Sequence, residues 1–353
     1  MTTPIDAALA ARTGAGAARP GPDIPRDQAA SAVAALRAAS RRAVAYVAEV
    51  TGLTEAASEA ATVGVHVIGR AGFVQANARM AAAIADGAFG ATATRFDRVA
   101  TSVELGLVLA FLSSRVLGQF DPFCGHFDAA SPAPSGPIAC SGGLILLVAP
   151  NVVAYERELD VPPADFRLWV ALHEMTHAVQ FAAAPWLAGH LLGLLRSLAA
   201  DEFSADDGAT PARLVKAVVR AARGDSGTSI VSDLLDGPAR EAMDAVTATM
   251  SLLEGHADVV MDAVGTEVIP SLALIRERFN ARRRGRSGFD RLVRRVAGLD
   301  VKTSQYVQGA AFVRGVQMRA GNQGLAAAFA TAENLPSPAE IADPAAWVTR
   351  VIG

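Results

Sequence analysis

Two histidines and a glutamate stand in an otherwise apolar stretch, and no other feature constrains the fold of this chain as strongly. Apolar residues recur at helical spacing through residues 165–185, and two prolines just before this range stand where a helix can begin. A buried helix cannot carry His173, Glu174 and His177 without polar partners, because burying an unpaired polar group costs free energy. The rest of the chain must fold around this helix and supply those partners.

The three polar residues have the spacing His-Glu-x-x-His, from His173 to His177. Residues four apart project from the same face of a helix, so both imidazoles can reach one zinc ion. Glu174 lies beside them, where it can hold the water that the zinc activates. The spacing predicts a metal site with His173 and His177 as ligands and Glu174 as the general base. The structural alternative is that the histidines are hydrogen-bonded core residues.

A catalytic zinc site needs a third protein ligand. A helix predicted over residues 239–264 carries Glu254 and Asp258, which are four apart and share a face. This arrangement resembles the gluzincins, in which a glutamate on a second helix binds zinc and an acid four residues later hydrogen-bonds a ligating histidine. The resemblance implies Glu254 as the ligand and Asp258 as its supporting acid. Gly255 would let the two helices approach closely. The separation of His177 from Glu254 is longer than in thermolysin-like enzymes.

Other histidines are weaker ligand candidates. His190 lies beyond a proline and reaches the site only if the next segment folds back. His256 points away from Glu254 around the helix, so we expect a hydrogen-bonding or structural role for it. The metzincin pattern is excluded, because Gln180 and Ala183 replace the glycine and histidine that it requires.

Composition favours a mainly helical globular chain. Hydrophobic residues make up 51% of the 353 residues and charged residues 19%, which excludes a mainly disordered protein. Residues 1–25 are rich in Ala, Gly and Pro and predict a disordered tail. We expect a single domain over residues 26–353, with a helical half over 26–127 and the metal-site half over 143–353. Helices are expected over residues 55–67 and 94–117, among others, and residues 144–149 are the best candidate for a strand.

The chain as a whole resembles a family of zincin-like, largely uncharacterised bacterial hydrolases, sometimes labelled as associated with deazaflavin coenzyme biosynthesis. The similarity runs through residues 116–122, 146–151, 165–181, 185–187, 253–258, 305–312 and 335–347. It implies a mainly α fold with a small β element, in which the helix with the two histidines packs against the second, glutamate-bearing helix. It also implies zinc-dependent metalloprotease activity and brings no established substrate.

Together these features predict a Zn²⁺-dependent metallopeptidase similar to the gluzincins, acting on a peptide or amide bond. The strand over residues 144–149 would offer an edge to an extended substrate. Tyr306 is a candidate donor to the oxyanion, with a buried structural tyrosine as the alternative; Lys302, on the same predicted helix, would line the cleft. Two further functions stay open. One is a catalytically silent zinc-binding or regulatory protein, and the other is a hydrolase of small amides.

Charge and targeting signals limit the partners. The formal net charge is −3, which argues against nucleic acid. No signal-peptide pattern and no apolar run of about 18 residues is present, so we expect a cytoplasmic protein without a membrane span. A homodimer is compatible with the apolar composition.

Overall fold

The computed structural model describes residues 3–89, 95–124, 142–204, 237–285 and 304–353. Helices dominate, and three short strands form one sheet, so the expected mainly α fold with a small β element is confirmed. The elements of the first part of the chain are α1 (Ala7–Ala17), α2 (Arg26–Thr51), α3 (Thr54–Ala60), β1 (Gly64–Ile68), α4 (Arg70–Phe89), α5 (Arg95–Leu112) and β2 (Gly118–Asp121).

The second part of the chain carries the predicted site. Its elements are β3 (Leu144–Val148), α7 (Ala149–Glu158), α8 (Pro163–Ala183), α9 (Leu187–Ser204), α12 (Gly237–Ala263), α13 (Gly265–Val268), α14 (Leu272–Gly285), α16 (Ser304–Ala326), the short 3-10 helices η1 (Ala327–Phe329) and η2 (Ala332–Asn334), α17 (Pro338–Ala342) and α18 (Pro344–Val351).

The sheet has the order β1-β3-β2, with β3 parallel to β1 and antiparallel to β2. All five residues of β3 are buried, as expected for a continuous apolar run in a central strand. The strand predicted at this position is confirmed, but its expected exposed edge is wrong, because β3 is paired on both sides. The edges of the sheet are β1 and β2.

Two predicted helices end earlier than expected: α3 ends at Ala60, not near residue 67, and α5 ends at Leu112, not near residue 117. Residues 64–68 form β1 instead, and residues 118–121, just beyond the second predicted helix, form β2. Helix α3 has already ended at Ala60, and the β-branched residues that follow Gly64 pair with β3. Local periodicity does not show this pairing, because the partner strand lies about 80 residues away in the sequence.

Helix α1 replaces the disordered tail expected at the N-terminus. The side chain of Asp6 caps the helix by accepting a hydrogen bond from the backbone N–H of Leu9 at 2.9 Å. Small residues let α1 pack closely on α5: a Cβ atom on Gly14 would lie 2.4 Å from the carbonyl oxygen of Gly106. The alanines and glycines that suggested disorder thus form a helix contact.

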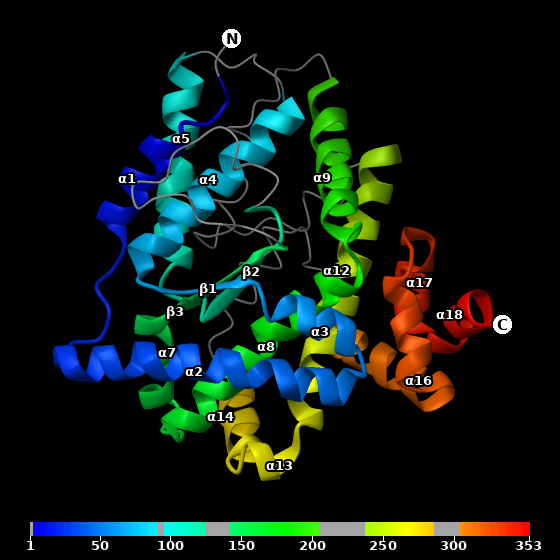
Figure 1. Cartoon of the computed structure of the whole chain (residues 1–353). Helices are drawn as coiled ribbons and strands as arrows, with labels where there is room; N and C mark the ends of the chain where they lie inside the picture. Colours follow the sequence, from blue (N-terminus) through cyan, green and yellow to red (C-terminus); the bar gives the residue numbers. More distant parts are fainter. Residues whose placement is uncertain (1–2, 90–94, 125–141, 205–236, 286–303) are drawn as a thin grey trace.

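Helix α8 occupies the centre of the molecule. In Figure 1 it lies below the sheet and behind α2, with α12 beside it, and it contacts α2, α3 and α12. Its residues between positions 166 and 180 are almost all buried, and Phe166, Leu172, Met175 and Val179 belong to the largest hydrophobic core. The helix with the two histidines is therefore fixed by packing on several sides.

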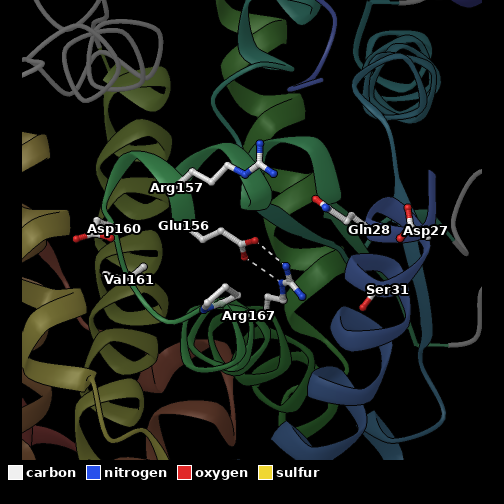
Figure 2. Close-up of a pocket in the computed structure, with 9 residues that line it drawn as sticks. Asp27, Gln28, Ser31, Glu156, Arg157, Asp160, Val161 and Arg167 are labelled. Carbon is white, nitrogen blue, oxygen red and sulfur yellow. Dashed lines mark hydrogen bonds and ion pairs between the residues drawn. The ribbon is translucent and has the colours of Figure 1, made fainter. Parts of the chain in front are cut away.

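The start of α8 is tied to α7 by an ion pair between Arg167 and Glu156. The Arg167 guanidinium donates to both carboxylate oxygens, at 2.6 and 3.0 Å. The pair lies at a polar surface hollow of about 570 Å³ between α2, α7 and α8. Figure 2 shows Glu156 and Arg167 facing each other, with Asp27 and Gln28 of α2 across the hollow. None of the residues that line this hollow belongs to the predicted metal site.

Gly255 does not have the role expected for it. A Cβ atom at this position would lie 2.2 Å from the carbonyl carbon of Gly309 in α16. The glycine therefore permits the close crossing of α12 and α16, not the approach of α12 to α8.

Within the described ranges, no single helix has the length and apolar composition of a membrane span. Helices α8 and α9 meet the length and composition test only as a pair, and they are bent by 93° at their junction.

Candidate metal centre

Helix α8 brings its two histidines together as their spacing predicts. The Nε2 atoms of His173 and His177 lie 3.1 Å apart, and the two rings are nearly perpendicular. Two lone pairs that face each other at this distance repel unless a proton or a metal cation lies between them. The pair therefore has the geometry of a shared cation site.

Glu254 of α12 joins the two histidines. Its carboxylate oxygens lie 3.4 Å from Nε2 of His173 and 3.7 Å from Nε2 of His177. All three ligand atoms lie within 4.8 Å of one another. Zinc binds nitrogen at about 2.0–2.1 Å, and tetrahedral ligands at that radius are separated by about 3.3 Å. The donor set and its spacing fit zinc.

The imidazole of His173 is the most basic of the three candidate ligand side chains. Burial lowers the pKa of this side chain, but the hydrogen bond and charge of Glu254, together with the charges of Glu174 and Asp258, raise it to about 9. Its other nitrogen, Nδ1, faces the sulfur of Met261 at 3.3 Å. A raised pKa at a group among three carboxylates indicates a site that attracts positive charge.

Glu174 is buried between α8 and the edge strand β2. Burial raises the pKa of its carboxyl group to about 7, while the charge of His173 and the backbone N–H of Phe120 act in the opposite direction and Glu254 adds to the increase. Gly118 makes room for this side chain, because a Cβ atom there would lie 2.6 Å from Cγ of Glu174. The strand thus packs directly against the candidate base.

Gln180, whose position in the sequence only excludes the metzincin pattern, lies in the site. It is fully buried. Its side-chain oxygen lies 2.8 Å from Nδ1 of His177, and its amide nitrogen lies 2.9 Å from the carbonyl oxygen of Leu253. The signal in the sequence is its position three residues after His177, on the same helical face.

These contacts determine the tautomer of His177. The carbonyl of Leu253 can only accept, so the amide nitrogen of Gln180 faces it and the amide oxygen faces His177. Nδ1 of His177 must then carry the hydrogen, which leaves the lone pair on Nε2 directed at the cluster. Burial lowers the pKa of His177, so the neutral ring that a metal requires is favoured.

His256 contacts Gln180 and is not a member of the ligand cluster. It is 2% exposed, its Nδ1 lies 3.1 Å from the amide nitrogen of Gln180, and its ring contacts Phe329. Burial, followed by the charge of His177, lowers its pKa to about 4. This is the hydrogen-bonding role expected for it.

Asp258 lies one helical turn beyond Glu254, but it does not form the hydrogen bond with a ligating histidine that was expected. Its carboxylate accepts from Arg276 of α14 at 3.1 Å. Among the described contacts, the Nδ1 atoms of the two histidines face Met261 and Gln180. Asp258 therefore reaches His173 through its charge, and Gln180 occupies the hydrogen-bonding position expected for an acid.

Three other residues singled out in the sequence are not placed in the cluster. His190 packs its ring against Trp186 at 5.8 Å. The backbone of Tyr306 belongs to α16, but its side chain lies outside the described part of the structure, and so does Lys302. The oxyanion role of Tyr306 stays a prediction.

The chain is similar to known proteins over nearly its whole length. A solved structure of a proposed hydrolase with a novel fold, from Chloroflexus aurantiacus, is similar to this chain with a TM-score of 0.66 and 26% identity, over 98% of each chain. A search of curated proteins finds no match. The sequence profile of the zincin-like metallopeptidases matches residues 5–348. The chain belongs to the zincin-like metallopeptidase family.

Proposed function

We propose that this chain is a zinc-dependent metallopeptidase that hydrolyses a peptide or amide bond. The observation that carries the proposal is the cluster of His173, His177 and Glu254, whose ligand atoms lie within 4.8 Å of one another beside a buried carboxyl group. Three protein ligands with an adjacent acid are typical of a catalytic zinc site, whereas structural zinc sites have four protein ligands.

His173, His177 and Glu254 would hold the metal. Zinc at this position would supply a Lewis acid that polarises the substrate carbonyl and lowers the pKa of the attacking water. Glu174 accepts a proton from that water and delivers it to the leaving nitrogen as the bond breaks. The backbone N–H of Phe120 orients the carboxylate for this transfer.

An extended substrate is supported by the position of β2. This strand forms one edge of the sheet, and Gly118 and Phe120 contact Glu174. A peptide segment that adds to this edge would pass its backbone over the candidate base. The strand β3, which its apolar run suggests for this role, is in the centre of the sheet and has no free edge.

The experiment is hydrolysis of a fluorogenic peptide library, with a set of small acyl amides in parallel, by the zinc-loaded protein. We expect peptide cleavage that a chelator abolishes, that zinc restores, and that the Glu174→Gln variant loses while still binding zinc. Cleavage of small amides alone would favour the small-amide hydrolase. A zinc-bound wild type that cleaves neither class would favour the catalytically silent zinc protein.

A further inference from the structure

A cavity of about 400 Å³ adjoins the candidate metal centre. It shares His173, Glu174, His177 and Glu254 with that centre. Beyond these residues its walls are almost entirely apolar and come from the β2 region, α8, α9 and α12. They include Phe123, Phe181, Leu191, Leu195, Val246 and Met250. The cavity therefore starts at the reactive groups and continues into an apolar space.

The apolar wall on α12 is in register with the metal ligand. Val246, Met250 and Glu254 follow one another at intervals of four residues, and all three line the cavity. Side chains at this spacing form a stripe along one face of a helix. The stripe leads from the candidate ligand through Met250, which is 38% exposed, to Val246.

Another part of the wall, from β2 and α8, is aromatic. The rings of Phe120 and Phe181 pack against each other with centroids 5.3 Å apart, and both residues line the cavity. Phe181 follows Gln180 directly on α8, so the helix that carries the histidines also forms part of this wall. An aromatic pair held in this way gives a rigid apolar surface beside the reactive groups.

Among the described residues that line the cavity, the ionisable groups are confined to the candidate metal centre. Glu174 and Glu254 line it, and none of the described residues in its wall is a lysine or an arginine. Away from the metal cluster, a substrate carboxylate would meet only apolar side chains and Gln119 among the described residues of the wall, and an unpaired buried charge is strongly disfavoured. A large apolar group, in contrast, gains free energy by leaving water.

We infer, on the basis of the function proposed above, that this cavity is a specificity pocket for an uncharged apolar group next to the scissile bond. The occupant is an aliphatic or aromatic side chain of a peptide substrate, of the size of leucine or phenylalanine. A substrate with a free carboxylate or an acidic side chain at this position is rejected. Transfer of such an apolar side chain out of water corresponds to about tenfold to a hundredfold in affinity.

Hydroxamates test this inference without a known substrate, because they bind zinc directly and carry groups of chosen chemistry. The probes are acetohydroxamate, hexanohydroxamate, phenylacetohydroxamate and the monohydroxamate of succinic acid. Their dissociation constants are measured by calorimetry on the zinc-loaded wild type. We expect hexanohydroxamate and phenylacetohydroxamate to bind at least tenfold more tightly than acetohydroxamate, and the succinate derivative to bind no more tightly than acetohydroxamate.

A matched pair of variants locates the effect in the cavity. Met250→Gln introduces a nearly isosteric polar group into the wall. Met318→Gln makes the same change at a methionine of α16 that is 79% exposed and does not line the cavity. We expect Met250→Gln to lose about threefold to tenfold in affinity for the two apolar probes and none for acetohydroxamate. Met318→Gln should match the wild type throughout.

The outcomes separate this inference from the proposed function. Equal affinities for acetohydroxamate and the apolar probes, or tighter binding of the succinate derivative, would overturn the specificity pocket and leave the metal site standing. Unchanged apolar affinity in Met250→Gln, with unchanged folding by circular dichroism, would also overturn it. A wild type that takes up no zinc would overturn the proposed function and this inference with it.

Discussion

The side-chain oxygen of Gln180 lies 2.8 Å from Nδ1 of His177. Through its amide nitrogen the same side chain reaches the carbonyl of Leu253, the residue before Glu254. One buried amide thus connects a histidine of α8 to the turn of α12 that carries the third candidate ligand. Removal of such partners from metal-ligating histidines typically costs tenfold to a hundredfold in affinity.

We expect the Gln180→Met variant to bind zinc about tenfold to a hundredfold more weakly than the wild type. Gln180→Glu keeps an acceptor for Nδ1 of His177 but loses the donor to Leu253, so it should bind zinc at least tenfold more tightly than Gln180→Met. Competition with a chromophoric chelator measures both constants, and nitrogen NMR of the metal-free protein reports the tautomer of His177. A role only in packing α8 on α12 would weaken both variants alike and leave the tautomer unchanged.

Zinc affinity should increase with pH. In the metal-free protein the raised pKa of His173, about 9, means that this ring holds a proton at neutral pH. Zinc must displace that proton, so the apparent affinity should rise by up to about tenfold per pH unit between pH 6 and 8. Calorimetry in two buffers of different ionisation enthalpy should show release of about one proton at pH 7. Binding that is independent of pH and releases no proton would contradict this ionisation state.

His256 should make the fold sensitive to acid. Its pKa is lowered to about 4, whereas an unfolded histidine titrates near 6.5, so the unfolded chain binds more protons between these values. The free energy of unfolding should therefore decrease by about 2 kcal/mol from this group alone between pH 7 and 5.

The His256→Asn variant tests this contribution, because the asparagine side chain keeps an acceptor for the amide of Gln180 and does not titrate. Urea unfolding at pH 7 and pH 5 should show a smaller loss of stability in the variant than in the wild type, by about 2 kcal/mol. An equal loss in both proteins would assign the acid sensitivity to other groups.

Gly118 should be required for the placement of the candidate base. In Gly118→Ala the added Cβ atom would collide with Cγ and Oε1 of Glu174, both 2.6 Å away. We expect the zinc content to stay near that of the wild type and kcat to fall at least tenfold, because the carboxylate moves from its position. Gly69→Ala is the matched control, since a Cβ atom there meets nothing within 4 Å. Equal losses of activity in the two variants would show that β2 does not position Glu174.

The sequence was sufficient to predict the parts of the site that depend on helical spacing. His173, Glu174 and His177 share one turn of α8, and the structure brings Glu254 to them from α12. The central strand was predictable too, because an apolar run bounded by Gly143 and Pro150 is too short for a typical helix.

The features that depend on distant partners were not predictable in the same way. The strand β1 is short and only partly buried, and its identity follows from its pairing with β3. The Ala- and Gly-rich sequence of α1 suggests disorder by itself, because the close contact of Gly14 with Gly106 in α5 that favours the helix is not visible in the sequence. The spacing of Gln180 within α8 indicates only its contact with His177, whereas its bridging role depends on Leu253 and His256, more than 70 residues away.

The central claim is a zinc site with three protein ligands and an adjacent base, and metal analysis tests it most directly. Zinc is measured by elemental analysis in the wild type, in Glu254→Ala and in Glu174→Gln after identical loading and gel filtration. We predict about one zinc per chain in the wild type and in Glu174→Gln, and a large loss in Glu254→Ala, because only the last variant removes a ligand. A wild type without zinc after loading, or a Glu254→Ala variant that retains a full equivalent, would contradict the account.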